Sequence, residues 1–115
     1  MKGNRPALRY AKAVLNLAKD SKQETLVNAS MQLIAETISE SDELAVVLNS
    51  PIIKTKDKIN ALTAIFSESI DQISLGLIGL LGENKRLSLL ALVASQYSVL
   101  FDHDKLIDVA KVTTA

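Results

Sequence analysis

Apolar residues that recur every three or four positions restrict the possible folds of this chain more than any other feature. Near the N-terminus they place one set of side chains on one face of a helical wheel: Ala7, Leu8, Ala11, Val14, Leu15 and Ala18. Similar spacing returns along residues 22–40, 55–66 and 87–101. It is typical of amphipathic helices that bury one face. Aromatic residues make up only 3% of the chain, so Leu, Ile, Ala and Val must supply most of the core.

Capping and turn residues divide the chain into six expected helices, so the sequence predicts an all-α protein, a six-helix bundle. Ser, Thr, Asp and Asn favour helix starts because their side chains accept hydrogen bonds from free backbone N–H groups. Pro fits the first turn, whose N–H groups have no partner within the helix. The candidate start signals are Asn4 with Pro6, Ser41, Thr55, and Ser69 or Asp71.

The stretch "LLGENKRLSLLALV", residues 80–93, separates two apolar runs with five residues that a hydrophobic core would not favour. We expect residues 82–86 to form an interhelical turn that ends the fifth helix and starts a long sixth helix. One face of that sixth helix carries Leu87, Leu90, Ala94, Tyr97 and Phe101.

The centre of each apolar arc predicts a core residue. On this basis Leu15, Leu33 and Leu90 should be buried. On the second helix, expected over residues 22–40, the inward face should consist of Leu26, Val27, Ser30, Leu33, Ile34, Thr37 and Ile38.

The last ten residues, "LIDVAKVTTA", change in character. They are rich in β-branched residues, which favour strands, and a single strand without a partner is not stable by itself. We therefore expect a helical domain over residues 1–105, and a truncated β-like tail over residues 106–115 that begins a missing C-terminal domain. We also expect the helical domain to be monomeric in isolation.

Charge and motif content argue against catalysis. The chain has no cysteine, and its one histidine, His103, has only two flanking carboxylates as nearby ligands, whereas zinc needs three or four. The spacing Gly76-x-x-Gly79-x-x-Gly82 lacks the preceding strand and the G-K-[ST] ending of a phosphate-binding loop. Ser88, Ser95 and Ser98 have no motif that places them beside a base. We expect no enzyme activity, no cofactor and no metal.

Nucleic-acid binding is the alternative function. The basic residues Lys54, Lys56 and Lys58, with the pair Lys85 and Arg86, could contact RNA, and all-helical RNA-binding domains of antitermination factors have a similar size. However, 13 Lys and Arg residues balance 13 Asp and Glu residues, and acidic residues interrupt or flank both basic groups. A polyanion binder needs clustered excess positive charge. A solvated face is therefore the favoured interpretation of these lysines.

Several stretches together resemble the delta subunit of bacterial F-type ATP synthase, which is equivalent to the mitochondrial oligomycin-sensitivity-conferring subunit. They are "RYAKAVLNLA" (9–18), "LNSPIIKTKDKINALTAIF" (48–66), "LLGENKRLSLL" (80–90), "QYSVLF" (96–101) and "VAKVTTA" (109–115). Where the family commonly reads E-N-G-R, this chain has Lys85 in place of glycine. The backbone at that position is therefore not expected to need a left-handed conformation.

The resemblance implies a non-catalytic stator subunit that binds an N-terminal helix of an alpha subunit at the top of the catalytic head. It implies contact with the peripheral-stalk b subunit through the absent C-terminal domain, and no nucleic-acid partner. The expected location is the cytoplasmic face of the bacterial inner membrane, with only indirect membrane contact through the complex.

Two helices carry the candidate partner-binding residues. The apolar arc of the first helix spans roughly 180°, wider than the stripe of about 100° that a core-facing helix needs. Its surplus edge is Tyr10, Ala13 and Leu17. On the fifth helix Gly76, Gly79 and Glu83 form a smooth ridge beside Leu80, although each interior glycine costs about 1 kcal/mol of helix stability.

Two interpretations of these glycines stay open. They could permit close packing within the bundle, or they could form one wall of a shallow groove that receives a partner helix. The groove would have Tyr10, Ala13, Val14 and Leu17 on one wall and Gly76, Gly79, Leu80 and Glu83 on the other.

Overall fold

The computed structural model describes the backbone of residues 4–114 and the side chains of residues 5–104. Six α-helices and one short 3-10 helix make up this part of the chain, and it contains no strand. They are α1 (Asn4–Asp20), α2 (Glu24–Glu40), α3 (Asp42–Asn49), α4 (Thr55–Phe66), α5 (Gln72–Glu83), η1 (Leu87–Leu89) and α6 (Leu90–Thr114). The predicted all-helical bundle is confirmed.

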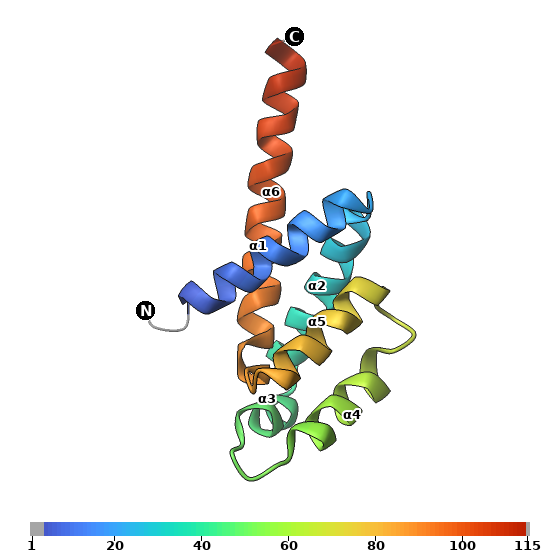
Figure 1. The fold of residues 1–115 in the computed structure, drawn as a ribbon, viewed down its shortest axis with the longest axis vertical. Coiled ribbons are helices and arrows are strands. Elements are labelled where there is room, and N and C mark those ends of the chain that lie inside the picture. Colours follow the sequence, from blue (N-terminus) through green and yellow to red (C-terminus); the bar gives the residue numbers. More distant parts are fainter. Residues whose placement is uncertain (1–3, 115) are drawn as a thin grey trace.

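Helix α6 is the longest element, and α1 and α2 pack extensively against it (Figure 1). Helix α5 contacts α1, α2 and α4, while α3 contacts α2 and η1. Figure 1 shows that the C-terminal turns of α6 extend well beyond the other helices, in a structure whose principal extents are 54 × 33 × 25 Å. The helical domain is therefore built around the N-terminal half of α6.

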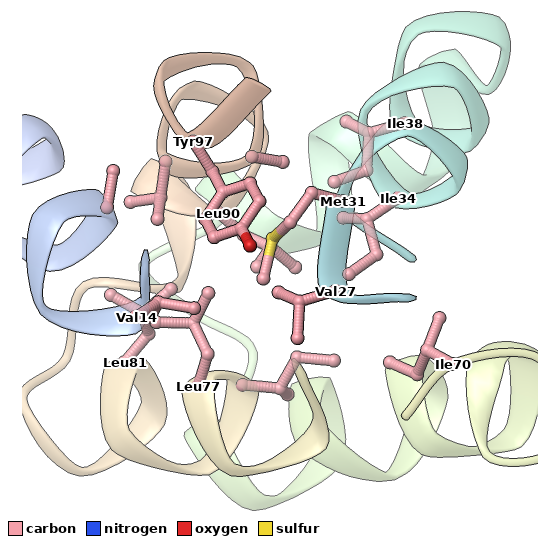
Figure 2. Close-up of a cluster of buried hydrophobic side chains, with 14 of the residues drawn as sticks. Val14, Val27, Met31, Ile34, Ile38, Ile70, Leu77, Leu81, Leu90 and Tyr97 are labelled. Carbon is pink, nitrogen blue, oxygen red and sulfur yellow. The ribbon is translucent and has the colours of Figure 1, made fainter. Parts of the chain in front are cut away.

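The core lies between α6, α2, α1 and α5, where Figure 2 shows Leu90 and Tyr97 facing Val27, Met31 and Val14. Residues along the buried face of α6 are almost fully enclosed: Leu90, Val93, Ala94 and Tyr97. The Tyr97 hydroxyl donates a hydrogen bond of 2.8 Å to the backbone carbonyl of Glu24. Burial of this phenol raises its pKa above the ordinary value, and the Glu24 and Asp71 carboxylates raise it further. Tyr97 therefore stays neutral and bonded in the core.

Local hydrogen bonds explain where two of the helices begin. Ser41 Oγ accepts from the backbone N–H of Leu44 at 3.2 Å and caps α3. Asp71, rather than Ser69, caps α5, and its carboxylate accepts from Ser74 N at 3.1 Å and from Ser74 Oγ at 2.6 Å. Burial of the Asp71 carboxyl raises its pKa, but hydrogen bonds from Ser74 and Ser30 outweigh that effect, so the pKa lies below its ordinary value.

Two other start signals behave differently from the prediction. Thr55 is the first helical residue of α4 rather than its cap, and no side chain caps that helix. Asn4 is the first residue of α1, and its side chain lies outside those described.

The predicted inward face of α2 is only partly right. Val27, Ser30, Ile34 and Ile38 are buried, but Leu26 and Leu33 are 54% and 37% exposed. Met31, which was not predicted, is fully buried instead. Residues 27, 31, 34 and 38 follow the spacing of three and four that directs one narrow seam toward α6, and both leucines lie one position away from that seam. Leu15 and Leu90 are buried as predicted.

The β-like tail is wrong for the described backbone, because α6 continues as a helix through Thr114. A helix satisfies its backbone hydrogen bonds within one segment, whereas a strand needs a neighbouring strand that this part of the chain does not provide. The side chains of residues 105–115 lie outside those described. The boundary between residues 105 and 106 stays a prediction, and α6 crosses it without a break.

The turn after α5 begins later than predicted and has a different conformation. Helix α5 includes Gly82 and ends at Glu83. Lys85 has a φ of 58°, in the left-handed region, which is contrary to the expectation drawn from the lysine at this position. Two bonds close the turn, from Lys85 N to Gly82 O at 3.0 Å and from Arg86 N to Leu81 O at 2.7 Å. This pair has the form of a Schellman motif, which imposes a left-handed residue whatever its side chain.

Candidate functional site: a groove between α1 and α5

An open apolar groove of about 410 Å³ lies between α1 and α5, and we call it the α1/α5 groove. Nine residues line it: Tyr10, Ala13, Val14, Leu17, Gln72, Ile73, Gly76, Leu77 and Leu80. Only Gln72 and the Tyr10 hydroxyl bring polar side-chain atoms to it. The groove therefore offers apolar contact and little hydrogen bonding.

The α1 wall exists because this helix has more apolar residues than its contact with α6 can bury. Ala7, Ala11 and Ala18 are fully buried, and their small side chains allow close contact between α1 and its neighbours. The adjacent edge stays open, with Leu17 53% exposed and Ala13 exposed. An exposed leucine beside other apolar groups is a surface that a partner can cover.

The α5 wall is smooth because Gly76 has no side chain. A Cβ atom added at Gly76 or at Gly79 would meet no described atom within 4 Å beyond its chain neighbours and the backbone of its own helix. Close packing within the bundle is therefore the wrong interpretation for both glycines. It holds for Gly82, where a Cβ atom would collide with the Ile59 side chain of α4.

The structure brings six of the eight predicted partner-binding residues into this one groove. The six are Tyr10, Ala13, Val14, Leu17, Gly76 and Leu80. Gly79 and Glu83 do not line the groove. Gly79 is turned about 60° away from Gly76 around the axis of α5, toward the side of Gly82. Glu83 lines a different hollow, beside α4.

Sequence reasoning missed Gln72, Ile73 and Leu77. Residues 73, 76, 77 and 80 follow one another at the helical spacings of three and four, which place all four on one side of α5, and this signal could have found Ile73 and Leu77.

At one end of the groove a hydrogen bond joins α1 to the turn after α5. Asn84 Nδ2 donates to the Tyr10 hydroxyl over 2.7 Å. Beyond Tyr10 lies a second hollow of about 470 Å³, lined by Arg5, Pro6, Arg9, Tyr10, Asn84 and Arg86. We call it the arginine hollow. Helices α1 and α5 run in opposite directions, so the start of α1 and the end of α5 meet there (Figure 1).

Residues considered for chemistry lie elsewhere and do not converge. His103 is exposed near the end of the described side chains, and no group of three His, Cys, Asp or Glu residues that could hold a metal occurs among the residues described. Within the same part of the chain, no helix is long and apolar enough to cross a membrane. Lys54, Lys58 and Lys85 line a hollow near α3, where the Lys58 ammonium donates to the Leu48 carbonyl at 3.2 Å.

The fold and the groove together define a small helical-bundle domain with a largely apolar groove between α1 and α5. Residues 7–115 match the family described as ATP synthase delta (OSCP) subunit, and the chain belongs to this family.

Bacterial relatives agree with that assignment. The ATP synthase subunit delta of Flavobacterium psychrophilum is 42% identical over 115 residues, which cover 100% of this chain and 64% of the relative. That of Christiangramia forsetii is 44% identical over 115 residues, which cover 100% of this chain and 62% of the relative. That of Chlorobaculum tepidum is 37% identical over 94 residues, or 82% of this chain and 52% of the relative. The chain thus spans less than two thirds of the length of these relatives.

Proposed function

We propose that this chain is the helical part of a peripheral-stalk subunit of a proton-translocating F-type ATP synthase, and that it has no catalytic role. Its task is to hold the N-terminal helix of an alpha subunit in the α1/α5 groove. The observation that carries this proposal is the groove itself, which is apolar and open. It lies in a chain that belongs to the ATP synthase delta (OSCP) subunit family. Contact with the b subunit belongs to the part of the relatives that this chain does not span.

The chemistry of the groove selects its occupant. An amphipathic helix places apolar side chains at spacings of three and four, and such a stripe can fill a slot with one smooth wall and one wall of exposed apolar side chains. Each square ångström of apolar surface removed from water contributes about 25 cal/mol. Leu17 and Leu80 are 53% and 43% exposed, so both have apolar area left to bury.

A stator needs slow dissociation rather than chemistry. Binding energy in protein interfaces concentrates in a few central apolar residues, and differences in affinity act mainly through the dissociation rate. Val14 and Leu77 are already packed in the domain and form a firm floor for the groove. This role also implies where the chain is located: at the cytoplasmic face of the bacterial inner membrane, with only indirect membrane contact through the complex.

The first experiment is a calorimetric titration of the 115-residue chain with a synthetic peptide of the alpha-subunit N-terminal region. An RNA oligomer is titrated in parallel at two salt concentrations, because phosphate contacts make RNA binding strongly salt-dependent. We expect saturable peptide binding and no specific RNA binding. Salt-sensitive RNA binding without peptide binding would instead support the RNA-binding alternative.

The second experiment locates the site. Gly76→Glu places a charge in the groove at a position where an added Cβ atom meets nothing within 4 Å beyond its own helix backbone, so it should retain or raise thermal stability. Peptide affinity should fall at least about tenfold, which corresponds to roughly 1.4 kcal/mol. Val46→Glu is the control, because Val46 is 67% exposed on α3 outside the groove. Normal peptide binding by a folded Gly76→Glu variant would contradict the proposed site.

A further inference from the structure

The arginine hollow adjoins the α1/α5 groove, because Tyr10 lines both. Arg5 and Arg9 lie one turn apart on α1, and Arg86 lies at the end of the turn after α5. The described residues that line this hollow include no acidic residue. The end of the groove beyond Tyr10 therefore changes from apolar to strongly positive.

None of these arginines has a charge partner among the side chains that the structure describes. The ion pair found among the described side chains joins Lys19 to Asp104 at 3.2 Å, and Arg5, Arg9 and Arg86 form none there. All three are exposed. Guanidinium groups are positively charged and repel each other when they lie close together. A carboxylate placed among them offsets that repulsion.

The hollow is also held in place. The Asn84–Tyr10 hydrogen bond of 2.7 Å ties the turn that carries Arg86 to the helix that carries Arg5 and Arg9. The left-handed Lys85 and the bond from Arg86 N to Leu81 O fix the backbone of Arg86. Arginine binds carboxylates through two parallel N–H donors, and such bonds are stronger than those between neutral groups.

We propose that the partner helix carries an acidic side chain at the end that passes Tyr10, and that the arginine hollow binds this carboxylate. This inference rests on the proposed function, since it concerns the same groove. The apolar part of the groove is compatible with a helix lying in either direction. The arginine hollow lies at one end only, so the carboxylate fixes the direction and register of the partner. Opposite charges also steer the encounter of two proteins and raise the association rate.

The test uses two probe peptides and three forms of the 115-residue chain. One peptide has the native sequence of the alpha-subunit N-terminal region, and the other has each Asp and Glu replaced by Asn and Gln. The chain is tested unchanged, as Arg9→Gln/Arg86→Gln, and as the matched control Lys12→Gln/Lys56→Gln. The control removes the same charge at positions that line neither the groove nor the arginine hollow.

We expect the unchanged chain to bind the acidic peptide about five- to tenfold more tightly than the neutral peptide at low salt. The lysine control should keep this preference, and the arginine variant should lose it while binding the neutral peptide normally. The preference should shrink at about 0.5 M salt, because the Debye length is then only a few ångströms and the attraction between exposed charges is screened.

The two proposals fail in different ways. Equal binding of both peptides by the unchanged chain, or a preference that survives in the arginine variant, overturns the carboxylate site and leaves the groove intact. If the unchanged chain binds neither peptide, the proposal that the groove holds the partner helix is wrong. Thermal unfolding of each variant checks that the arginine substitutions act on binding rather than on folding.

Discussion

Asn84 donates a hydrogen bond from Nδ2 to the hydroxyl of Tyr10 over 2.7 Å, and so joins the turn after α5 to α1 across 74 residues of sequence. The bond is exposed, which limits its contribution to stability. Its position matters more than its energy, because the bond lies where the apolar groove meets the arginine hollow.

A double-mutant cycle should measure this bond. Tyr10→Phe removes only the hydroxyl and leaves the ring in the groove, while Asn84→Ala removes the donor. We expect a coupling free energy of about 0.5 to 1 kcal/mol in chemical denaturation, as is usual for a neutral hydrogen bond. A coupling near zero would mean that the two side chains bond to water instead of to each other.

Leu90 and Leu33 should respond very differently to truncation. Leu90 is fully buried at the start of α6, so Leu90→Ala should cost about 2 to 5 kcal/mol through lost burial and the cavity that remains. Leu33 is 37% exposed on α2, and Leu33→Ala should cost less than about 1 kcal/mol. Urea denaturation of both variants tests the pair, and similar costs would show that the described register of α2 is wrong.

The three helical glycines should separate into two classes on substitution by alanine. Gly76→Ala and Gly79→Ala meet open space and should each stabilise the domain by up to about 1 kcal/mol through helix propensity. Gly82→Ala forces its Cβ atom against Ile59 and should destabilise by about 1 kcal/mol.

The variant Gly82→Ala/Ile59→Val provides the control, because it removes the Ile59 Cδ1 atom that the new methyl group meets. Its thermal stability should exceed that expected from adding the two single effects. Additive effects would show that Ile59 does not limit the space at Gly82.

The stability of the folded domain should depend on pH through the Asp71 carboxylate. Its pKa in the folded state lies below the ordinary value, so the folded state favours the carboxylate. The contribution to stability is full above the unfolded pKa of about 3.9 and is lost as the pH falls through the folded pKa. Asp71→Asn should therefore lower the melting temperature at pH 6, and the difference from the unchanged chain should shrink toward pH 3. A constant difference over this range would show that the charge of Asp71 has no role.

The sequence by itself determined those features that depend on neighbours only a few residues away. Helical spacing identified the bundle, and the capping chemistry of Ser41 was readable because its bond to Leu44 spans three residues. The buried face predicted for the sixth helix followed in the same way, since Leu90, Ala94, Tyr97 and Phe101 of α6 are buried, as is Leu87, which lies in η1 just before α6. Even part of the groove was predictable, because the surplus apolar edge of α1 is a local property of one helix.

The tertiary structure decided whatever depends on residues far apart in sequence. Only the approach of α4 shows that Gly82, and not Gly76 or Gly79, is the closely packed glycine. Contact with α6 selects Met31 over Leu33 on α2, although both are apolar and two positions apart. The arginine hollow could not be read from separate stretches, because Arg5 and Arg86 meet only after α1 and α5 pack side by side in opposite directions. Local chemistry fixes which segments are helices, but burial depends on which distant surface each helix meets, and a periodic pattern does not contain that information.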